Sequence, residues 1–80
     1  MTKLYWVSLI IQDYEDSKPW LCSFALPHDN IEESKKSIER GRKNYRVLSA
    51  WIDTFDKDGN KTTIFHECYI NALGQLDTIK

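Results

Sequence analysis

The sequence predicts a single α+β domain with the element order ββαββ, and three observations lead to this prediction. The chain has 80 residues, which suits one compact domain. Four segments have the pattern of strands, and the first of them is rich in β-branched and aromatic residues, whereas one segment has the periodicity of an amphipathic helix. Polar loops separate the strands within two hairpins, and the helix joins the hairpins. We therefore expect one domain over residues 1–80, of which residues 75–80 can form a flexible tail.

The first hairpin is predicted from residues 3–13 and 20–26, with a polar loop at 14–17. In its first strand the odd positions are all apolar, and the even positions are interrupted by Ser8 alone. A strand that is apolar on both faces belongs inside a sheet or beneath a partner. Pro19 and Pro27 bracket the second strand, and each lacks the N–H group that a central strand requires. The odd set is Tyr5, Val7, Leu9 and Ile11, and the even set is Leu4, Trp6, Ser8 and Ile10.

The helix is predicted over residues 30–43. Asp29 is a suitable N-cap, and Glu32 lies where it completes a capping box. Gly41 or Asn44 can end the helix. The face that would pack on the sheet is narrow and has small side chains, so the helix must lie close to the strands. The residues of this face are Ile31, Ser34, Ile38, Gly41 and Tyr45.

The second hairpin is predicted from residues 46–55 and 61–73, which flank the pair Asp58-Gly59. This pair favours either a two-residue type I′ turn or a slightly longer loop with Gly59 at positive φ. If the helix is a crossover, the third strand runs parallel to the second. A four-stranded, mainly antiparallel sheet in the order 2-1-3-4, numbered along the chain, then makes all neighbours antiparallel. This order puts the first strand inside, and the helix covers one face.

The composition excludes several classes of protein. Eleven Lys and Arg residues against twelve Asp and Glu residues give a net charge of −1, which removes the simplest argument for nucleic acid or an anionic membrane as partner. The apolar run at residues 4–11 is much shorter than the roughly 20 residues that cross a bilayer. It also lacks the cleavage site of a signal peptide, so we expect a cytoplasmic protein. Cys22 and Cys68 should then be buried, reduced thiols.

We predict that the chain is not an enzyme and binds no cofactor or metal. If Gly59 took the sixth position of an EF-hand loop, Phe65 would stand where a bidentate glutamate is needed. His66 and Cys68 share one strand face, but zinc requires three or four ligands, and paired ligand spacing is absent. The same pair lacks an orienting third group for nucleophilic catalysis. The sequence also has no phosphate loop, dinucleotide fingerprint or serine elbow.

The leading functional hypothesis is a protein interface on the uncovered face of the sheet. One helix covers one face, so the other must carry large apolar side chains, and monomers seldom expose a large apolar patch. We assign the odd positions of the first strand to the core and place Trp6 and Ile10 on the open face, where Trp51 can join them. The partner would be another protein or a second copy of the chain in a homodimer. Alternatively, residues 75–80, with Leu76 and Ile79, fold back over this face, or the aromatic side chains simply fill a small core.

A nucleic-acid interface is the alternative hypothesis. Six basic residues stand against the single acid Glu39 within residues 35–46, and Trp6 or Trp51 could stack on bases. Favourable i,i+4 ion pairs and the helix dipole explain the same cluster as an ordinary solvated helix end. The expected pairs are Glu32 with Lys36 and Glu39 with Lys43, and the cluster comprises Lys35, Lys36, Arg40, Arg42, Lys43 and Arg46. No motif is dense enough to assign a family, although the size and character of the chain are typical of small bacterial and phage proteins.

Overall fold

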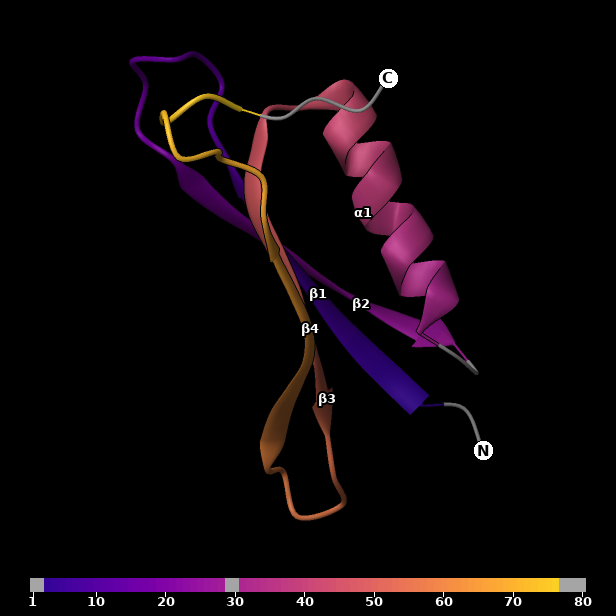
Figure 1. The fold of residues 1–80 in the computed structure, drawn as a ribbon. Coiled ribbons are helices and arrows are strands. Elements are labelled where there is room, and N and C mark those ends of the chain that lie inside the picture. The colour runs from indigo at the N-terminus through magenta and orange to yellow at the C-terminus, as the bar shows by residue number, and fades with distance from the viewer. Residues whose placement is uncertain (1–2, 29–30, 77–80) are drawn as a thin grey trace.

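A computed structural model of the protein describes residues 3–28 and 31–76. Its elements are β1 (Lys3–Ile11), β2 (Trp20–His28), α1 (Glu32–Asn44), β3 (Val47–Phe55) and β4 (Lys61–Cys68), as Figure 1 shows. The strands form one sheet in the order β2-β1-β3-β4, and every pair of neighbours is antiparallel. The α+β class, the ββαββ order and the sheet order 2-1-3-4 are therefore confirmed.

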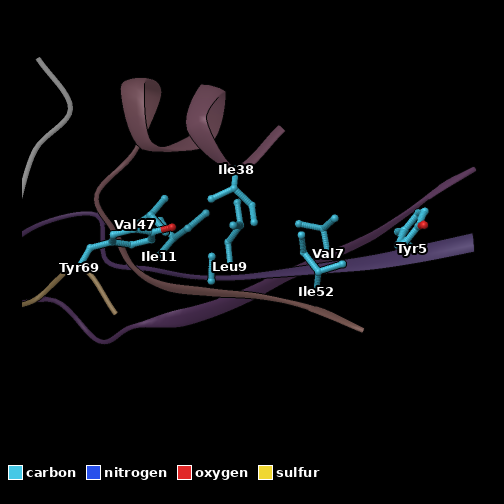
Figure 2. Close-up of a cluster of buried hydrophobic side chains, with 9 residues drawn as sticks. Tyr5, Val7, Leu9, Ile11, Ile38, Val47, Ile52 and Tyr69 are labelled. Carbon is cyan, nitrogen blue, oxygen red and sulfur yellow. The ribbon is translucent and has the colours of Figure 1, made fainter. Parts of the chain in front are cut away.

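The core lies between α1 and the face of the sheet that this helix covers. Figure 2 shows Ile38 of α1 directed toward Leu9 of β1. The odd-numbered residues of β1 from Tyr5 to Ile11 are all buried, as the alternation predicts. Gly41 lets the helix approach the sheet, because a methyl group at this position would lie only 3.1 Å from Cδ1 of Leu9. The core residues are Tyr5, Val7, Leu9, Ile11, Ile38, Val47, Ala50, Ile52 and Tyr69.

The start of α1 differs from the prediction. The helix begins at Glu32, and its N-cap is Ile31, which makes no capping hydrogen bond through its side chain. The expected cap Asp29 lies outside the described residues. Ser34 and Ile38 are buried, so the centre of the predicted packing face is correct.

The end of α1 also differs from the prediction. Tyr45 is predicted to pack on the sheet, but its side chain is 58% exposed. Its backbone is extended, with φ of −137° and ψ of 160°, so the helical periodicity stops before this residue. Asn44 is the last helical residue, and its side-chain amide donates a hydrogen bond to the carbonyl of Arg40 at 2.9 Å.

The turn between β3 and β4 is the longer of the two predicted forms. Gly59 has a φ of +85°, and no residue other than glycine has positive φ in the described chain, which excludes a type I′ turn. The N–H of Gly59 donates to the carbonyl of Asp56 at 3.0 Å. The carboxylate of Asp56 accepts the N–H groups of Asp58 and Asn60 at 2.8 and 2.9 Å. Hydrogen bonds from Asn60, and then those from Asp58 and Gly59, hold the pKa of Asp56 below its usual value.

The segment after β4 contains a second turn of the same design. Asn71 takes the place of Asp56, and its side-chain oxygen accepts the N–H groups of Leu73 and Gln75 at 2.9 and 3.0 Å. Gly74 has a φ of +78° and donates its N–H to the carbonyl of Asn71 at 2.9 Å. The predicted continuation of the fourth strand to residue 73 is therefore wrong, because β4 ends at residue 68 and the chain turns back.

The two cysteines lie far apart. Cys22 is half-buried and Cys68 is exposed, so the predicted burial is wrong for Cys68 and only partly met by Cys22. Both cysteines belong to edge strands, but Cys22 packs against the core on the covered face, whereas Cys68 does not. The outer strands β2 and β4 are three strand spacings apart, or about 14 Å. A disulfide needs Cα atoms within about 7 Å, so these thiols cannot pair within one chain. In the described part of the chain no helix is long and apolar enough to cross a membrane.

Candidate protein interface on the open sheet face

The face of the sheet that turns away from α1 is the candidate site, and we call it the open face. Side chains alternate between the two faces along each strand, and the register shows which residues of neighbouring strands share a face. Because the odd-numbered residues of β1 from Tyr5 to Ile11 belong to the core, the even-numbered residues of this strand belong to the open face. The open-face residues are Leu4, Trp6, Ser8 and Ile10 of β1, Leu21, Ser23 and Ala25 of β2, Ser49, Trp51, Asp53 and Phe55 of β3, and Lys61, Thr63, His66 and Cys68 of β4.

Large apolar side chains are exposed on the open face. The rings of Trp6 and Phe55 meet edge to face, with centroids 6.4 Å apart. Trp51 lies opposite His66 in the register, and their ring centroids are also 6.4 Å apart. The candidate interface residues Trp6, Ile10 and Trp51 thus share one face, as the alternation predicts. The exposed fractions are 49% for Leu4, 39% for Trp6, 57% for Leu21 and 47% for Phe55.

Two polar groups at the centre of the open face already have partners. Ser8 is buried, and its hydroxyl lies 3.1 Å from that of Ser23 on β2. Asp53 is also buried, and its carboxylate accepts a hydrogen bond from the hydroxyl of Thr63. A β-bulge at Ile64 brings these two residues opposite each other. A partner covering this face would therefore leave neither Ser8 nor Asp53 without a hydrogen bond.

Sequence reasoning missed the roles of Asp53 and Thr63. An acidic residue inside an otherwise apolar strand is the signal that could have found Asp53, because a buried carboxylate needs a donor nearby. Nothing in the residue types indicates Thr63, since its position depends on the bulge.

The described part of the C-terminal segment lies at one end of the sheet. Leu76 packs against the core, and it lines a cavity together with Gln12 and Arg46, where β1 ends and β3 begins. The prediction that this segment covers the open face is thus wrong for Leu76. Residues 77–80, with Ile79, lie outside the described residues.

The basic residues of α1 make contacts within the chain. Nζ of Lys35 lies 3.7 Å from a carboxylate oxygen of Glu32 and 5.2 Å from the centre of the Phe65 ring. Nζ of Lys36 lies 3.4 Å from a carboxylate oxygen of Glu33. The expected pair of Glu32 with Lys36 is therefore wrong. Lys35 lies near the Phe65 ring and pairs with Glu32, and Lys36 pairs with Glu33.

The rest of the basic cluster is dispersed. The guanidinium of Arg42 lies over the ring of Tyr69, 3.7 Å from its centroid. Glu39 and Lys43 do not form the expected ion pair, since the described pairs within α1 have i,i+3 spacing. Arg46 lies beyond the last helical residue and is half-buried. The six cations therefore do not form one continuous charged stripe.

The aromatic and basic features lie on opposite sides of the sheet. Trp6 and Trp51 belong to the open face, whereas α1 and its cations lie on the covered face (Figure 1). A nucleic acid could not lie against both at once without wrapping around the edge of the sheet. The structure therefore does not bring together the two parts of the nucleic-acid hypothesis.

Groups with acid–base or metal-binding chemistry are sparse. His66 and Cys68 share one face of β4, as predicted, and the register places them on the open face. The described residues hold no group of three or more side chains able to bind a metal ion. Burial, and then a hydrogen bond with Glu67, raises the pKa of Tyr69 to about 12. Its phenol, which lies beneath the guanidinium of Arg42, therefore stays protonated at pH values above the ordinary pKa of 10.

These features define a class of protein: a ββαββ domain with one face of its sheet covered by a helix and the other face apolar and exposed. Comparison of the chain with protein-family models, with curated proteins and with solved structures finds no match to any of them.

Proposed function

We propose that the protein is a binding module that docks another polypeptide on its open face, and that a second copy of the chain is the occupant this face fits best. The observation that carries this proposal is the set of exposed apolar residues on one face, with Trp6 and Phe55 in contact toward one end and Leu21 opposite Ile10 toward the other. Hydrophobic burial is the main driving force of such association. Exposed apolar patches of this kind mark protein interaction sites.

The lack of charge on the open face favours a second copy. Charged residues make up 29% of the chain, yet Asp53 is the only acid among the open-face residues, and it is buried. Lys61 lies at the rim, opposite Phe55. Two copies can therefore meet face to face without like charges at the centre, whereas a strongly charged partner would find no complementary group there.

The size of the open face also suits a dimer. Strands of nine residues are about 30 Å long and four strands span about 19 Å, which gives a flat footprint of roughly 570 Å². A standard interface removes about 800 Å² of accessible surface from each partner. The accessible area of a face exceeds its footprint because side chains project from it, so a standard interface would occupy most or all of the open face. Two such faces would pack about 10 Å apart, as in a β-sandwich.

Sedimentation velocity over a range of protein concentrations tests this proposal. The wild-type chain should sediment as a dimer at high concentration, and Trp6→Glu or Trp51→Glu should shift it toward monomer. Tyr14→Glu is the matched control, because Tyr14 is an exposed aromatic residue outside the sheet. Far-UV circular dichroism and urea unfolding should show that all variants fold cooperatively.

Three results would contradict the proposal. They are a wild-type chain that stays monomeric at millimolar concentration, equal effects of the Trp6 and Tyr14 variants, or unfolding of a monomer by the Trp6 variant. Added salt should change dimerisation little. A single-stranded oligonucleotide that binds the chain, with affinity falling steeply as salt rises, would favour the nucleic-acid alternative through the basic cluster.

We also infer that the protein acts in the cytoplasm. The support for this inference is that Cys22 and Cys68 are free thiols that one chain cannot join, and Cys68 is exposed. A reducing compartment keeps such thiols unpaired.

A further inference from the structure

A cavity separate from the open face lies where β1 ends and β3 begins. It has a volume of about 410 Å³, within the usual range for sites that bind small molecules. Its walls come from the loop after β1, the start of β3 and the turn after β4, which Figure 1 shows at the same end of the sheet. The lining residues that matter here are Gln12, Glu15, Arg46, Leu48, Ile70 and Leu76.

Arg46 is the unusual residue of this cavity. Its Nε atom is buried and has no hydrogen-bond partner. Arg46 forms no ion pair with the acids near it: Asp13 instead accepts a hydrogen bond from the indole of Trp20 at 3.3 Å, and Glu15 makes no salt bridge in the described chain. The guanidinium of Arg46, which lines the cavity, therefore has donor N–H groups that no group of the described chain occupies, and an acceptor that enters the cavity can bind those that face it.

The surroundings of Arg46 are held in place before any ligand arrives. Its own carbonyl accepts the N–H of Gln12 at 2.9 Å, which ties the start of β3 to the end of β1. The side-chain amide of Gln12 donates to the carbonyl of Ser17 at 2.8 Å, which fixes the loop after β1. On the opposite wall, the bridge between Ile70 and Leu76 closes the turn that Asn71 organises. A preformed site of this kind loses little freedom when it binds a ligand.

The lining determines what kind of ligand fits. A guanidinium matches the two oxygens of a carboxylate in its planar geometry. Glu15 also lines the cavity and offsets part of the charge of Arg46, the only cation among the lining residues, so a ligand with one negative charge is favoured over a dianion such as phosphate. Leu48, Ile70 and Leu76 provide apolar surface beside the charge. We propose that this cavity binds a small monocarboxylate that carries a short apolar group, with its carboxylate on Arg46.

A second cavity of about 340 Å³ also has Arg46 in its lining, but it suits this ligand less well. Asp13 and Lys43 both line it, so their charges offset each other, and Ile11 is its only aliphatic lining residue. The ligand is therefore assigned to the first cavity, where the apolar walls are.

Titration of the ¹⁵N-labelled full chain with hexanoate, followed by two-dimensional NMR, tests this site. The backbone amides of Gln12, Leu48 and Gln75 should shift in a saturable way. Hexanol and inorganic phosphate should bind at least about tenfold more weakly, because hexanol lacks the charge and phosphate lacks the apolar group. Arg46→Gln should weaken hexanoate binding by about tenfold or more. Arg40→Gln removes the same charge from an exposed position of α1 and should leave binding unchanged.

The proposal is overturned if hexanoate causes no saturable shifts, or if the Arg46 and Arg40 variants bind it equally. If Arg46→Gln fails to fold, the wild-type comparison decides: equal affinity for hexanoate and hexanol would exclude a role for the guanidinium. Trp6→Glu should bind hexanoate as the wild type does. The outcome at this cavity is thus independent of the outcome at the open face.

Discussion

Replacing Gly59 by alanine should destabilise the protein by about 1 kcal/mol, and the structure isolates a single cause for this loss. Gly59 has a φ of +85°, and a methyl group added to it would have no atom within 4 Å. The loss therefore comes from the backbone conformation and not from a clash. Gly74 has a φ of +78° and equally open surroundings, so Gly74→Ala is an independent repeat of the experiment.

The magnitude follows from two opposing effects. The left-handed conformation costs a residue with a Cβ atom about 1–2 kcal/mol. Alanine also restricts the unfolded chain, which offsets about 0.4–1 kcal/mol of that cost. The difference is about 1 kcal/mol, against a total stability of about 4–12 kcal/mol for a chain of 80 residues. Gly59→Asn should lie between alanine and the wild type, because asparagine tolerates positive φ better than alanine does.

Urea unfolding followed by tryptophan fluorescence provides the measurement. With a slope of about 1 kcal/mol per molar urea, Gly59→Ala should lower the unfolding midpoint by about 1 M. All variants must be compared at one protein concentration, since self-association would add to apparent stability. Equal midpoints for Gly59→Ala and the wild type would refute the reasoning. A Gly59→Asn variant less stable than Gly59→Ala would show that the side chain, and not the backbone, determines the loss.

Three further predictions concern buried or reactive side chains. Ser34→Ala should raise the free energy of unfolding by roughly 0.5–1 kcal/mol, because the Ser34 hydroxyl is buried without a hydrogen-bond partner and alanine favours the helix; an unchanged urea midpoint would contradict this. Tyr69 has a folded pKa of about 12, above its ordinary value of 10, so its contribution to stability is complete below pH 10 and is lost as the pH rises toward 12. Phenolate absorbance should show one tyrosine that ionises near pH 12, and complete ionisation by pH 11 would disprove it. Cys68 should react with a thiol reagent in the folded chain faster than the half-buried Cys22, and equal rates would argue against the exposure assigned to Cys68.

Apolar alternation predicts the sheet well because β1 lies at its centre. Its side chains must be apolar on the covered face, and Trp6 and Ile10 keep the other face apolar as well. The same pattern predicts the position of Trp51, since the hairpin signal at Asp58-Gly59 fixes where β3 ends. The fold and the open face therefore follow from local pattern and simple topology.

Features that depend on single-residue shifts do not follow from the pattern. Leu48 and Ile64 are extra residues in the β1–β3 and β3–β4 ladders, and no residue type marks such bulges. The turn at Asn71 and Gly74 repeats the spacing of Asp56 and Gly59. Apolar residues flank this turn, so the sequence pattern resembles that of a continuing strand and does not reveal the turn.

The cavity at Arg46 could not be predicted from charge patterning. In the sequence Arg46 is one of six cations within twelve positions, and nothing separates it from Lys43 or Arg42. Arg46 is separated from the cations of the helix because α1 ends at Asn44 and the chain then enters β3. Burial of its Nε atom then depends on contacts with segments distant in the sequence.

The order of the sheet has a consequence for how the chain folds. Each hairpin pairs residues that are close in sequence, but the pairing of β1 with β3, which we call the β1–β3 seam, joins Tyr5 to Thr54 and Ile11 to Val47. Closing this seam requires loops of dozens of residues, so we expect it to limit the folding rate. Until it closes, β1 and β3 are edge strands, which are open to pairing with another chain. A hairpin from one chain can complete the same seam with a neighbour, so slow refolding at high concentration should yield domain-swapped dimers.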